Sequence, residues 1–343
     1  MSADSPLIPA TVVGSHGKPG WWFAGVKAHE AGEFGPADLE EMLADAADTA
    51  IRDMEAAGLD IITDGEVRRL DGYVDSYYAI IKGIEAIPVR RQAGPWGYDQ
   101  QTRYEAVGRI ETPSGGLGIV EEFKYLKAHT TRRTKATCAG PLTFGSRIHP
   151  GRMYKGVVDV AERFAEVINA ELKALVAAGA DFIQIDEPAR GNVSGEEMAR
   201  LFNLATEGVT AKLGYHICFG NRFGRSRFDR SYEPYFPGLL KSRAHQFVLE
   251  FAGREMAEID LWKTYGEGRE LGAGVVDVKG FNQDTPEQVA RRIRRVLTVC
   301  PPEKLYVNPD CGFGWSPRYM CNQKVQALAA GARIVREGLT GKK

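Results

Sequence analysis

Residues that could bind a metal ion stand close together near the middle of the chain. His216 and Cys218 are two positions apart in the apolar run 215–218. Side chains two positions apart in a strand point to the same side, so this imidazole and this thiolate can meet one ion. Zn²⁺ binds nitrogen and sulfur ligands of this kind and takes carboxylate oxygen as a third type. The pair predicts a zinc site, with ordinary core packing of both side chains as the alternative.

Two later runs offer further metal ligands. Glu250 lies inside the run 246–251, where a carboxylate that faces the core must be paired or coordinated. Cys311 follows an Asn-Pro-Asp turn after the run 305–308. With His216 and Cys218, these two residues would complete a set of one imidazole, two thiolates and one carboxylate. The remaining cysteines are expected to pack in the core: Cys138, Cys300 and Cys321.

Polar side chains follow most of the other apolar runs. Ser15 and Glu66 follow the first two runs of the chain. Asp186 and Lys279 follow two later ones, and Glu187 is the alternative to Asp186 in the same Asp-Glu-Pro turn. Functional side chains of α/β barrels come from the carboxyl ends of the strands. We therefore expect these residues to face one common site.

The runs themselves predict an alternation of strands and helices. Apolar residues at three- and four-residue steps mark the amphipathic helices between them. Strands are expected at 11–14, 59–63, 135–138, 181–185, 215–218, 246–251, 274–278 and 305–308. Helices are expected at 36–57, 157–178, 196–213, 286–300 and 322–337. This alternation predicts an α/β fold, a (β/α)₈ TIM barrel. A doubly wound sheet is the runner-up, but no Gly-x-Gly-x-x-Gly follows the first strand.

Two stretches depart from the alternation. Residues 71–134 are rich in Tyr, Gly and Arg and predict an elaborated insertion, so residues 1–343 are expected to form a single catalytic barrel. Residues 219–243 are irregular and carry five arginines. Because this second stretch leaves the strand of His216 and Cys218, it should lie at the mouth of the site. Its guanidinium groups could bind an anionic substrate there, or they could simply be solvated.

Composition excludes several classes of protein. Hydrophobic residues make up 43% and charged residues 26%, as in a soluble enzyme. A formal net charge of −1 gives no basic field for nucleic acid or a membrane surface. No apolar run approaches the roughly 20 residues of a membrane span. The N-terminus shows no secretory signal and five scattered cysteines predict no disulfide framework, so a cytoplasmic protein is expected. The oligomeric state is left open, a homo-oligomer included.

Short motifs in order along the chain resemble those of the catalytic C-terminal barrel of cobalamin-independent methionine synthase. They are Val-Val-Gly-Ser at 12–15, Asp-Gly-Glu at 64–66, Ala-Gly-Pro at 139–141, Gln-Ile-Asp-Glu-Pro-Ala at 184–189, His-Ile-Cys at 216–218 and Val-Asn-Pro-Asp-Cys-Gly at 307–312. One such motif would be weak evidence. Six in the same order, across nearly the whole chain, are specific.

The resemblance implies a zinc-dependent methyltransferase that converts homocysteine to methionine. It implies a catalytic zinc ion held by His216, Cys218, Glu250 and Cys311. It also implies that the amino-acid end of homocysteine is held by Ser15, Glu66 and Asp186. A free thiol has a pKa of about 8.5, and coordination to zinc would deprotonate it and keep its sulfur nucleophilic.

Two features depart from the pattern of that family. The synthase has a second, N-terminal barrel that helps to bind its folate, and this sequence carries none, so the methyl donor is left open among methyl-folate, methylcobalamin and others. Where the synthase has a proton-donating histidine, this sequence has Lys279. Lys279 is expected to be a desolvated acid or a cation for an anionic substrate, with a solvated strand end as the alternative. Lys279 and Asp186 are the catalytic candidates, and Trp315 is the favoured aromatic contact to the substrate.

Two other functions stay open at the level of the sequence. A related zinc alkyltransferase could use another thiol or electrophile, for example coenzyme M with an epoxide. A barrel with a purely structural zinc could instead bind a partner through its arginine-rich stretch. A structural site is closed by four protein ligands and does not open to a thiol. Adding homocysteine would therefore change the metal coordination only in a catalytic site.

Overall fold

The computed structural model describes residues 6–70, 73–87, 93–94, 97–98, 102–188, 192–221, 224–226, 229–266, 268–314 and 316–341. Its centre is a six-stranded parallel sheet in the order β13-β12-β11-β10-β9-β7. The strands are β7 (Ala136–Ala139), β9 (Phe182–Asp186), β10 (Lys212–Ile217), β11 (Gln246–Leu249), β12 (Glu270–Val276) and β13 (Leu305–Pro309). Almost every residue in them is buried, as in parallel sheets that are covered on both faces.

The two ends of this sheet are joined by the first part of the chain. β1 (Ile61–Ile62) pairs in parallel with β6 (Arg133–Thr134), which leads directly into β7. Thr11 forms a parallel bridge to β1, and Ala10 forms one to β13. The described residues thus make a closed ring of eight strands. The predicted (β/α)₈ barrel is confirmed, and the open doubly wound sheet is excluded.

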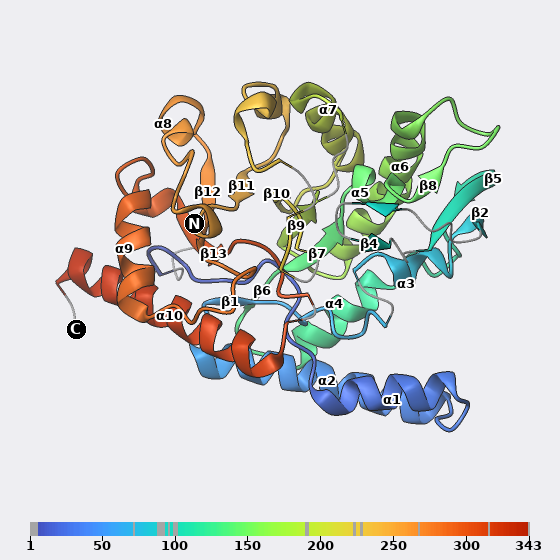
Figure 1. Cartoon of the computed structure of the whole chain (residues 1–343), viewed down its shortest axis with the longest axis horizontal. Helices are drawn as coiled ribbons and strands as arrows, with labels where there is room; N and C mark the ends of the chain where they lie inside the picture. The colour runs from blue at the N-terminus through green and yellow to red at the C-terminus, as the bar shows by residue number, and fades with distance from the viewer. Residues whose placement is uncertain are drawn as a thin grey trace.

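Helices surround the ring and connect its strands (Figure 1). They are α1 (Gly20–Glu30), α2 (Pro36–Ala57), α4 (Ile119–Ala128), α5 (Pro141–Gly145), α6 (Val157–Ala177), α7 (Gly195–Ala205), α8 (Leu261–Tyr265), α9 (Pro286–Val296) and α10 (Arg318–Thr340). α2 has its predicted bounds and buries one face against the barrel. It ends at Gly58, whose φ of 84° is a left-handed conformation that glycine adopts without strain. α10 packs against both α2 and α9.

Some helix ends differ from the prediction, and several helices, including α1, α4, α5 and α8, were not predicted. α7 stops at Ala205 rather than at 213, because the chain turns through Gly208, with φ of 72°, before β10 begins. α1 was not predicted, because its large apolar residues follow one another instead of recurring at helical steps. Of the three consecutive aromatic residues in α1, Trp22 is buried, whereas Trp21 and Phe23 are exposed.

The predicted insertion combines a barrel helix with a separate small sheet. β2 (Lys82–Ile87) pairs antiparallel with β5 (Arg103–Glu111), and β5 also pairs with β8 (Ile148–His149). This sheet lies at the side of the barrel, on the right in Figure 1. The same stretch holds α3 (Asp75–Tyr78), the two-residue pair β3 (Ala93–Gly94) and β4 (Gly97–Tyr98), and the barrel helix α4. The insertion therefore elaborates one connection of the barrel.

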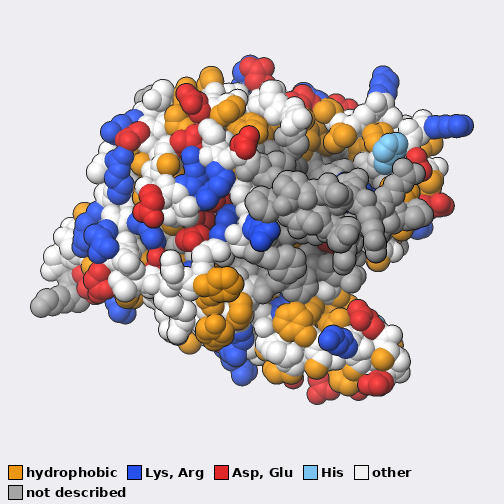
Figure 2. Space-filling model, in the orientation of Figure 1, with side chains coloured by type: hydrophobic (Ala, Val, Ile, Leu, Met, Phe, Trp, Pro, Cys, Tyr) orange, Lys and Arg blue, Asp and Glu red, His pale blue; other side chains and the backbone are white. Residues whose placement is uncertain are grey.

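The arginine-rich stretch forms the connection between β10 and β11. Two 3₁₀ turns, η1 (Glu233–Tyr235) and η2 (Gly238–Lys241), replace a barrel helix there. η3 (Ala252–Arg254) follows β11, and η4 (Pro302–Lys304) precedes β13. Arg222 and Arg227 lie outside the described residues. On the face drawn in Figure 2, basic and acidic side chains are interspersed, as the net charge of −1 leads one to expect. Within the described part of the chain, no helix has both the length and the apolar character needed to cross a bilayer.

Candidate metal centre and substrate pocket

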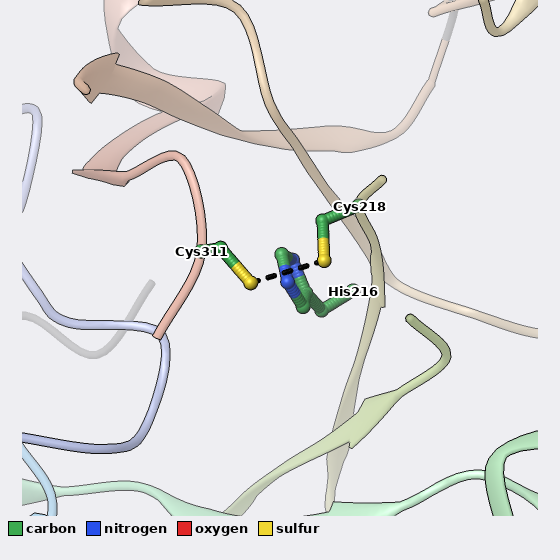
Figure 3. Close-up of side chains that lie close together, drawn as sticks. All are labelled: His216, Cys218 and Cys311. Atoms are coloured by element: carbon green, nitrogen blue, oxygen red, sulfur yellow. Dashed lines mark hydrogen bonds between the residues drawn. The ribbon is translucent and has the colours of Figure 1, made fainter. Parts of the chain in front are cut away.

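Three of the predicted metal ligands converge at the carboxyl ends of β10 and β13 (Figure 3). One potential ligand atom from each of His216, Cys218 and Cys311 lies within 4.8 Å of the others. The sulfur atoms of Cys218 and Cys311 are 3.1 Å apart. His216 lies within β10 and Cys218 directly follows it, so the strand period of two turns both side chains toward the same point. The three residues are buried.

The orientation of His216 suits a metal ligand. Its Nδ1 lies 3.1 Å from the carbonyl oxygen of Val248 on β11, which can only accept a hydrogen bond. Nδ1 therefore donates. The Nε2 atom is buried and has no hydrogen-bond partner among the described residues. A histidine that donates one ring N–H to a backbone carbonyl presents its other nitrogen to a metal ion, and the carbonyl fixes the ring.

The two thiols differ in acidity. Burial opposes ionisation of Cys218, but the hydrogen bond from Cys311 and the nearby His216 and Lys279 hold the Cys218 pKa well below its usual range. The same hydrogen bond to Cys218, together with burial, raises the pKa of Cys311. The sulfur pair therefore behaves as a thiolate that accepts a hydrogen bond from a thiol. A divalent cation would take the place of that shared proton.

The fourth predicted ligand, Glu250, lies outside this three-residue group. Its fully buried carboxylate accepts a hydrogen bond from Lys279 Nζ at 2.7 Å and one from Arg230 Nη2 at 3.2 Å. The backbone N–H of Phe219, next to Cys218, approaches the same carboxylate at 3.3 Å. Glu250 thus lies next to the three-residue group, and its carboxylate is paired with two cations, Lys279 and Arg230. Tyr232 fixes the strand ends nearby, donating to Ile217 O and accepting from the Glu250 backbone N–H.

Lys279 is held rigidly rather than solvated. Its side chain is 7% exposed. Its backbone N–H donates to the Asp277 carboxylate at 2.8 Å, and the buried Lys324 donates to the carbonyl oxygens of Asp277 and Asn282 on either side. Burial opposes the charge, but the Glu250 carboxylate and the two sulfur atoms outweigh it and raise the Lys279 pKa above its usual value. The alternative prediction, that Lys279 is a solvated residue at the end of a strand, is therefore wrong.

Ser15 and Glu66 lie at the ends of the first two strands. Ser15 Oγ accepts a hydrogen bond from Gly314 N at 3.0 Å, which joins the first strand to the loop after Cys311. Glu66 has a left-handed backbone, with φ of 55°, and its Oε1 accepts from Thr137 Oγ1 at 2.8 Å. The same oxygen lies 2.9 Å from Arg69, a buried guanidinium. The side chain of Glu66 is thus held in place, and the positive charge of Arg69 offsets part of its negative charge.

Asp186 lies beside the metal-ligand group. It is the last residue of β9 and is paired in register with His216 on β10. Burial raises its pKa to about 7, and the charge of Glu66 contributes, while His216 opposes the shift. Asp186 Oδ1 accepts from Gln184 Nε2 at 2.6 Å. Its neighbour Glu187 faces elsewhere and accepts hydrogen bonds from the backbone N–H groups of α5, so it binds a helix terminus.

Several residues near the site were assigned no role from the sequence, although Asp64 and Gln184 belong to the motifs quoted there. The buried Lys135 donates to Val12 O at 2.5 Å and to Gln184 Oε1 at 2.6 Å, which fixes the amide that holds Asp186. Asp64 is buried, and its Oδ2 has no hydrogen-bond partner among the described residues. Gln184 could have been found, because it alternates with Asp186 along β9. Trp315, the predicted aromatic contact, lies outside the described residues.

Comparison with known proteins agrees with this geometry. The profile of the family described as cobalamin-independent synthase, catalytic domain, matches residues 8–333. The chain therefore belongs to this family. It is 38% identical over 343 residues to the methionine synthase of Saccharolobus solfataricus, covering 98% of this chain and 97% of that one. It is 36% identical over 344 residues to the methionine synthase of Sulfurisphaera tokodaii, covering 99% and 96%.

Solved structures of methionine synthases also match this chain. A B12-independent methionine synthase from Shewanella sp. W3-18-1, in complex with selenomethionine, matches with a TM-score of 0.83 and 28% identity over 98% of this chain and 99% of that one. A putative vitamin-B12-independent methionine synthase from Listeria monocytogenes shares the fold, with a TM-score of 0.66 and 19% identity over 96% of this chain and 98% of that one. The resemblance found in the sequence motifs is confirmed.

Proposed function

We propose that this chain transfers a methyl group to the sulfur of homocysteine and releases methionine. Full-length similarity to methionine synthases supports this reaction. The observation that carries the proposal is the buried group of His216, Cys218 and Cys311, which lies next to the carboxylate of Asp186. In the reaction the thiol releases its proton, and its sulfur bonds to the methyl carbon as the bond between that carbon and the donor breaks.

We propose that zinc is the metal. Two thiolates and one imidazole form a donor set that Zn²⁺ prefers, and the buried Nε2 of His216 has no other described partner. Bound zinc would lower the pKa of the substrate thiol and fix its sulfur in the pocket. Glu250 is the fourth ligand that the resemblance implies, and a carboxylate that yields its place to the substrate thiol is compatible with a catalytic rather than a structural zinc site.

We propose that Ser15, Glu66 and Asp186 bind the amino-acid end of the thiol substrate. Two buried carboxylates near the metal-ligand group suit an ammonium group, whose positive charge would favour their ionised forms. The selenomethionine in the Shewanella structure is the selenium counterpart of the proposed product, which supports a pocket for this amino acid. Asp186 acts in the proposal by orienting the substrate, with its own orientation set by Gln184.

We further propose that residues 1–343 work as one catalytic unit in the cytoplasm, on small-molecule substrates. All five cysteines are free and buried, which suits a reducing compartment. The methyl donor is identified by experiment: purified protein is incubated with homocysteine or mercaptoethanesulfonate as the thiol, and with methyl-folate, methylcobalamin or an epoxide as the donor. Methionine formed from either methyl donor supports the proposal. A product formed only from mercaptoethanesulfonate and an epoxide would replace it with the alkyltransferase alternative.

The first prediction concerns the metal. About one zinc ion per chain should copurify, and Cys311→Ser should weaken zinc binding severely, because it removes one of the two thiolates. Zinc content is measured by atomic emission after dialysis. Cys300→Ser is the matched control, since Cys300 is buried outside the group and should leave the zinc content unchanged. Full zinc occupancy in Cys311→Ser would exclude this residue from the site.

A further inference from the structure

Tyr73 carries a buried hydroxyl group that the proposed reaction does not use. It lies in the turn between Glu66 and α3. Its ring is half-buried and packs against the core, whereas its hydroxyl oxygen is buried and has no hydrogen-bond partner among the described residues. Most buried polar groups in proteins have a partner, so an unpaired one needs an explanation. A group of the substrate can supply the missing hydrogen bond.

The surroundings of Tyr73 belong to the proposed pocket for the amino-acid end of the substrate. The centre of its ring lies 5.8 Å from the guanidinium carbon of Arg69, which in turn contacts Glu66 Oε1 at 2.9 Å. Burial raises the pKa of the Tyr73 phenol well above its usual value, and the charges of Asp186 and Glu66 raise it further. Both carboxylates therefore lie within electrostatic reach of this hydroxyl, which stays protonated and neutral.

Tyr77 on α3 provides a comparison. Its ring also lies beside Arg69, with 5.5 Å between the guanidinium carbon and the ring centre, and its buried hydroxyl has no partner among the described residues either. Among carboxylates, Glu122 acts most strongly on the pKa of Tyr77, whereas Asp186 acts most strongly on that of Tyr73. The two phenols thus share one cation but differ in the carboxylate that influences them most.

The hydrogen-bonding capacity of an ammonium group exceeds what two carboxylates of this pocket provide directly. An ammonium has three N–H donors, and Glu66 and Asp186 would each accept one of them. Each of these carboxylates already has one oxygen bound by the protein, through Thr137 and Gln184. A phenolic oxygen beside them is a third acceptor, and its own proton can be donated to a carboxylate. Two negative charges disfavour the substrate's carboxylate at this point, so the positive end is the one that Tyr73 would meet.

We propose that the Tyr73 hydroxyl is the third acceptor for the ammonium group of the thiol substrate, and that it makes the site selective for an amino thiol. The inference rests on the proposed function, in which Glu66 and Asp186 bind the same ammonium group. It assigns Tyr73 to substrate binding and not to the chemistry at sulfur. The hydroxyl, which no described residue binds, gains its hydrogen bond from the substrate.

The test uses three thiols that separate the two charged groups of the substrate. They are homocysteine, 3-mercaptopropylamine, which lacks the carboxylate, and 4-mercaptobutanoate, which lacks the amine. Isothermal titration calorimetry on zinc-loaded protein, without a methyl donor, measures their dissociation constants. In Tyr73→Phe, homocysteine and 3-mercaptopropylamine should each bind about tenfold more weakly, because a hydrogen bond to a charged group is lost. 4-Mercaptobutanoate should bind as it does to the wild type, because it brings no ammonium.

Tyr77→Phe is the matched control. It removes the hydroxyl of the other phenol beside Arg69 and should leave the binding of all three thiols unchanged. Zinc analysis, circular dichroism and thermal unfolding check the metal content and the fold of each variant. A purely structural role of Tyr73 would weaken the binding of all three thiols alike, so the selectivity among them decides between the two roles.

The inference is overturned if Tyr73→Phe weakens 4-mercaptobutanoate as much as homocysteine, or if it leaves homocysteine binding unchanged. It is also overturned if Tyr77→Phe reproduces the selective loss. A wild-type protein that binds homocysteine no better than 4-mercaptobutanoate would instead contradict the proposed binding of the ammonium group by Glu66 and Asp186, and the role of Tyr73 would fall with it.

Discussion

At the scale of single residues, the site proposed for the amino-acid end of the substrate contains two carboxylates in different environments. Glu66 already has partners in Arg69 and Thr137. Asp186 has one oxygen bound by Gln184, and its pKa is raised to about 7 by burial. An incoming ammonium would therefore gain most from Asp186, whose charge is compensated less than that of Glu66.

A second prediction follows for these two carboxylates. Asp186→Asn should raise the KM for homocysteine by roughly ten- to a hundredfold, the loss expected for one charge-assisted hydrogen bond, with zinc still bound. Glu66→Gln should also raise it, but less, because Arg69 already shares that charge. Steady-state kinetics and metal analysis on the same samples measure both effects. Loss of zinc from Asp186→Asn, or an unchanged KM, would contradict the assignment.

The sequence was sufficient for some of the site and not for the rest. His216 and Cys218 could be predicted as a pair because a strand fixes their relative direction, and Cys311 because it ends a later strand of the same barrel. The Lys279–Glu250 pair could not be predicted. Each residue follows a different strand, and only the structure shows that the lysine side chain reaches from the end of β12 to the carboxylate at the end of the neighbouring β11.

At the scale of elements, strands were located better than helix ends. Apolar runs in a barrel are short and are bounded by polar residues, so their positions are well defined. The helix after β9 was predicted too long because its periodicity continues through a turn. The 3₁₀ turns between β10 and β11 were not predictable, because they depend on tertiary contacts such as that of Tyr232 with the ends of both strands.

The short helix α5 depends on Glu187, the residue after Asp186. Glu187 accepts hydrogen bonds from the Thr143 backbone N–H and hydroxyl at the start of α5. Burial raises the Glu187 pKa from 4.5 to about 8, although these hydrogen bonds oppose the shift. A raised pKa in the folded state contributes stability that is complete below pH 4.5 and is lost as the pH rises through about 8.

A third prediction tests this linkage. Glu187→Gln cannot ionise but keeps an oxygen that accepts from Thr143. The variant should therefore gain thermal stability relative to the wild type as the pH rises from about 5 to about 9. Differential scanning calorimetry at several pH values measures the difference in Tm. Glu196→Gln, at an exposed glutamate paired with Lys241, is the control and should show no such trend. A constant difference in Tm across this range would contradict the shift.

At the scale of the whole molecule, the barrel is closed by the first strand of the chain, which pairs with its neighbours through isolated bridges only among the described residues. Only single bridges from Ala10 and Thr11 join β13 to β1 among the described residues. Asp60 reinforces this junction: its carboxylate accepts from the Ala10 backbone N–H at 2.7 Å and from Arg336 on α10 at 2.7 Å. The last helix therefore helps to hold the first strand in the ring.

A fourth prediction concerns this junction. Arg336→Ala should lower the free energy of unfolding by about 1–2 kcal/mol, because a partly buried carboxylate loses a charged hydrogen-bond partner. Urea denaturation measures the change. Arg333→Ala, on the same helix but 71% exposed, is the matched control and should change stability by less than about 0.5 kcal/mol. Equal effects of the two substitutions would show that the ion pair between Arg336 and Asp60 does not stabilise this junction.

The sulfur pair has a consequence for the handling of the protein. Cys218 and Cys311 come from strands on separate parts of the chain, yet their sulfur atoms lie 3.1 Å apart, and one of them has the character of a thiolate. Without a metal ion, a thiolate beside a thiol is open to oxidation, and a disulfide between them would remove both of the proposed thiolate ligands at once. Metal-free protein exposed to air should lose its capacity for metal, and a dithiol reductant should restore it. The metal would thus protect the redox state of the site that it occupies.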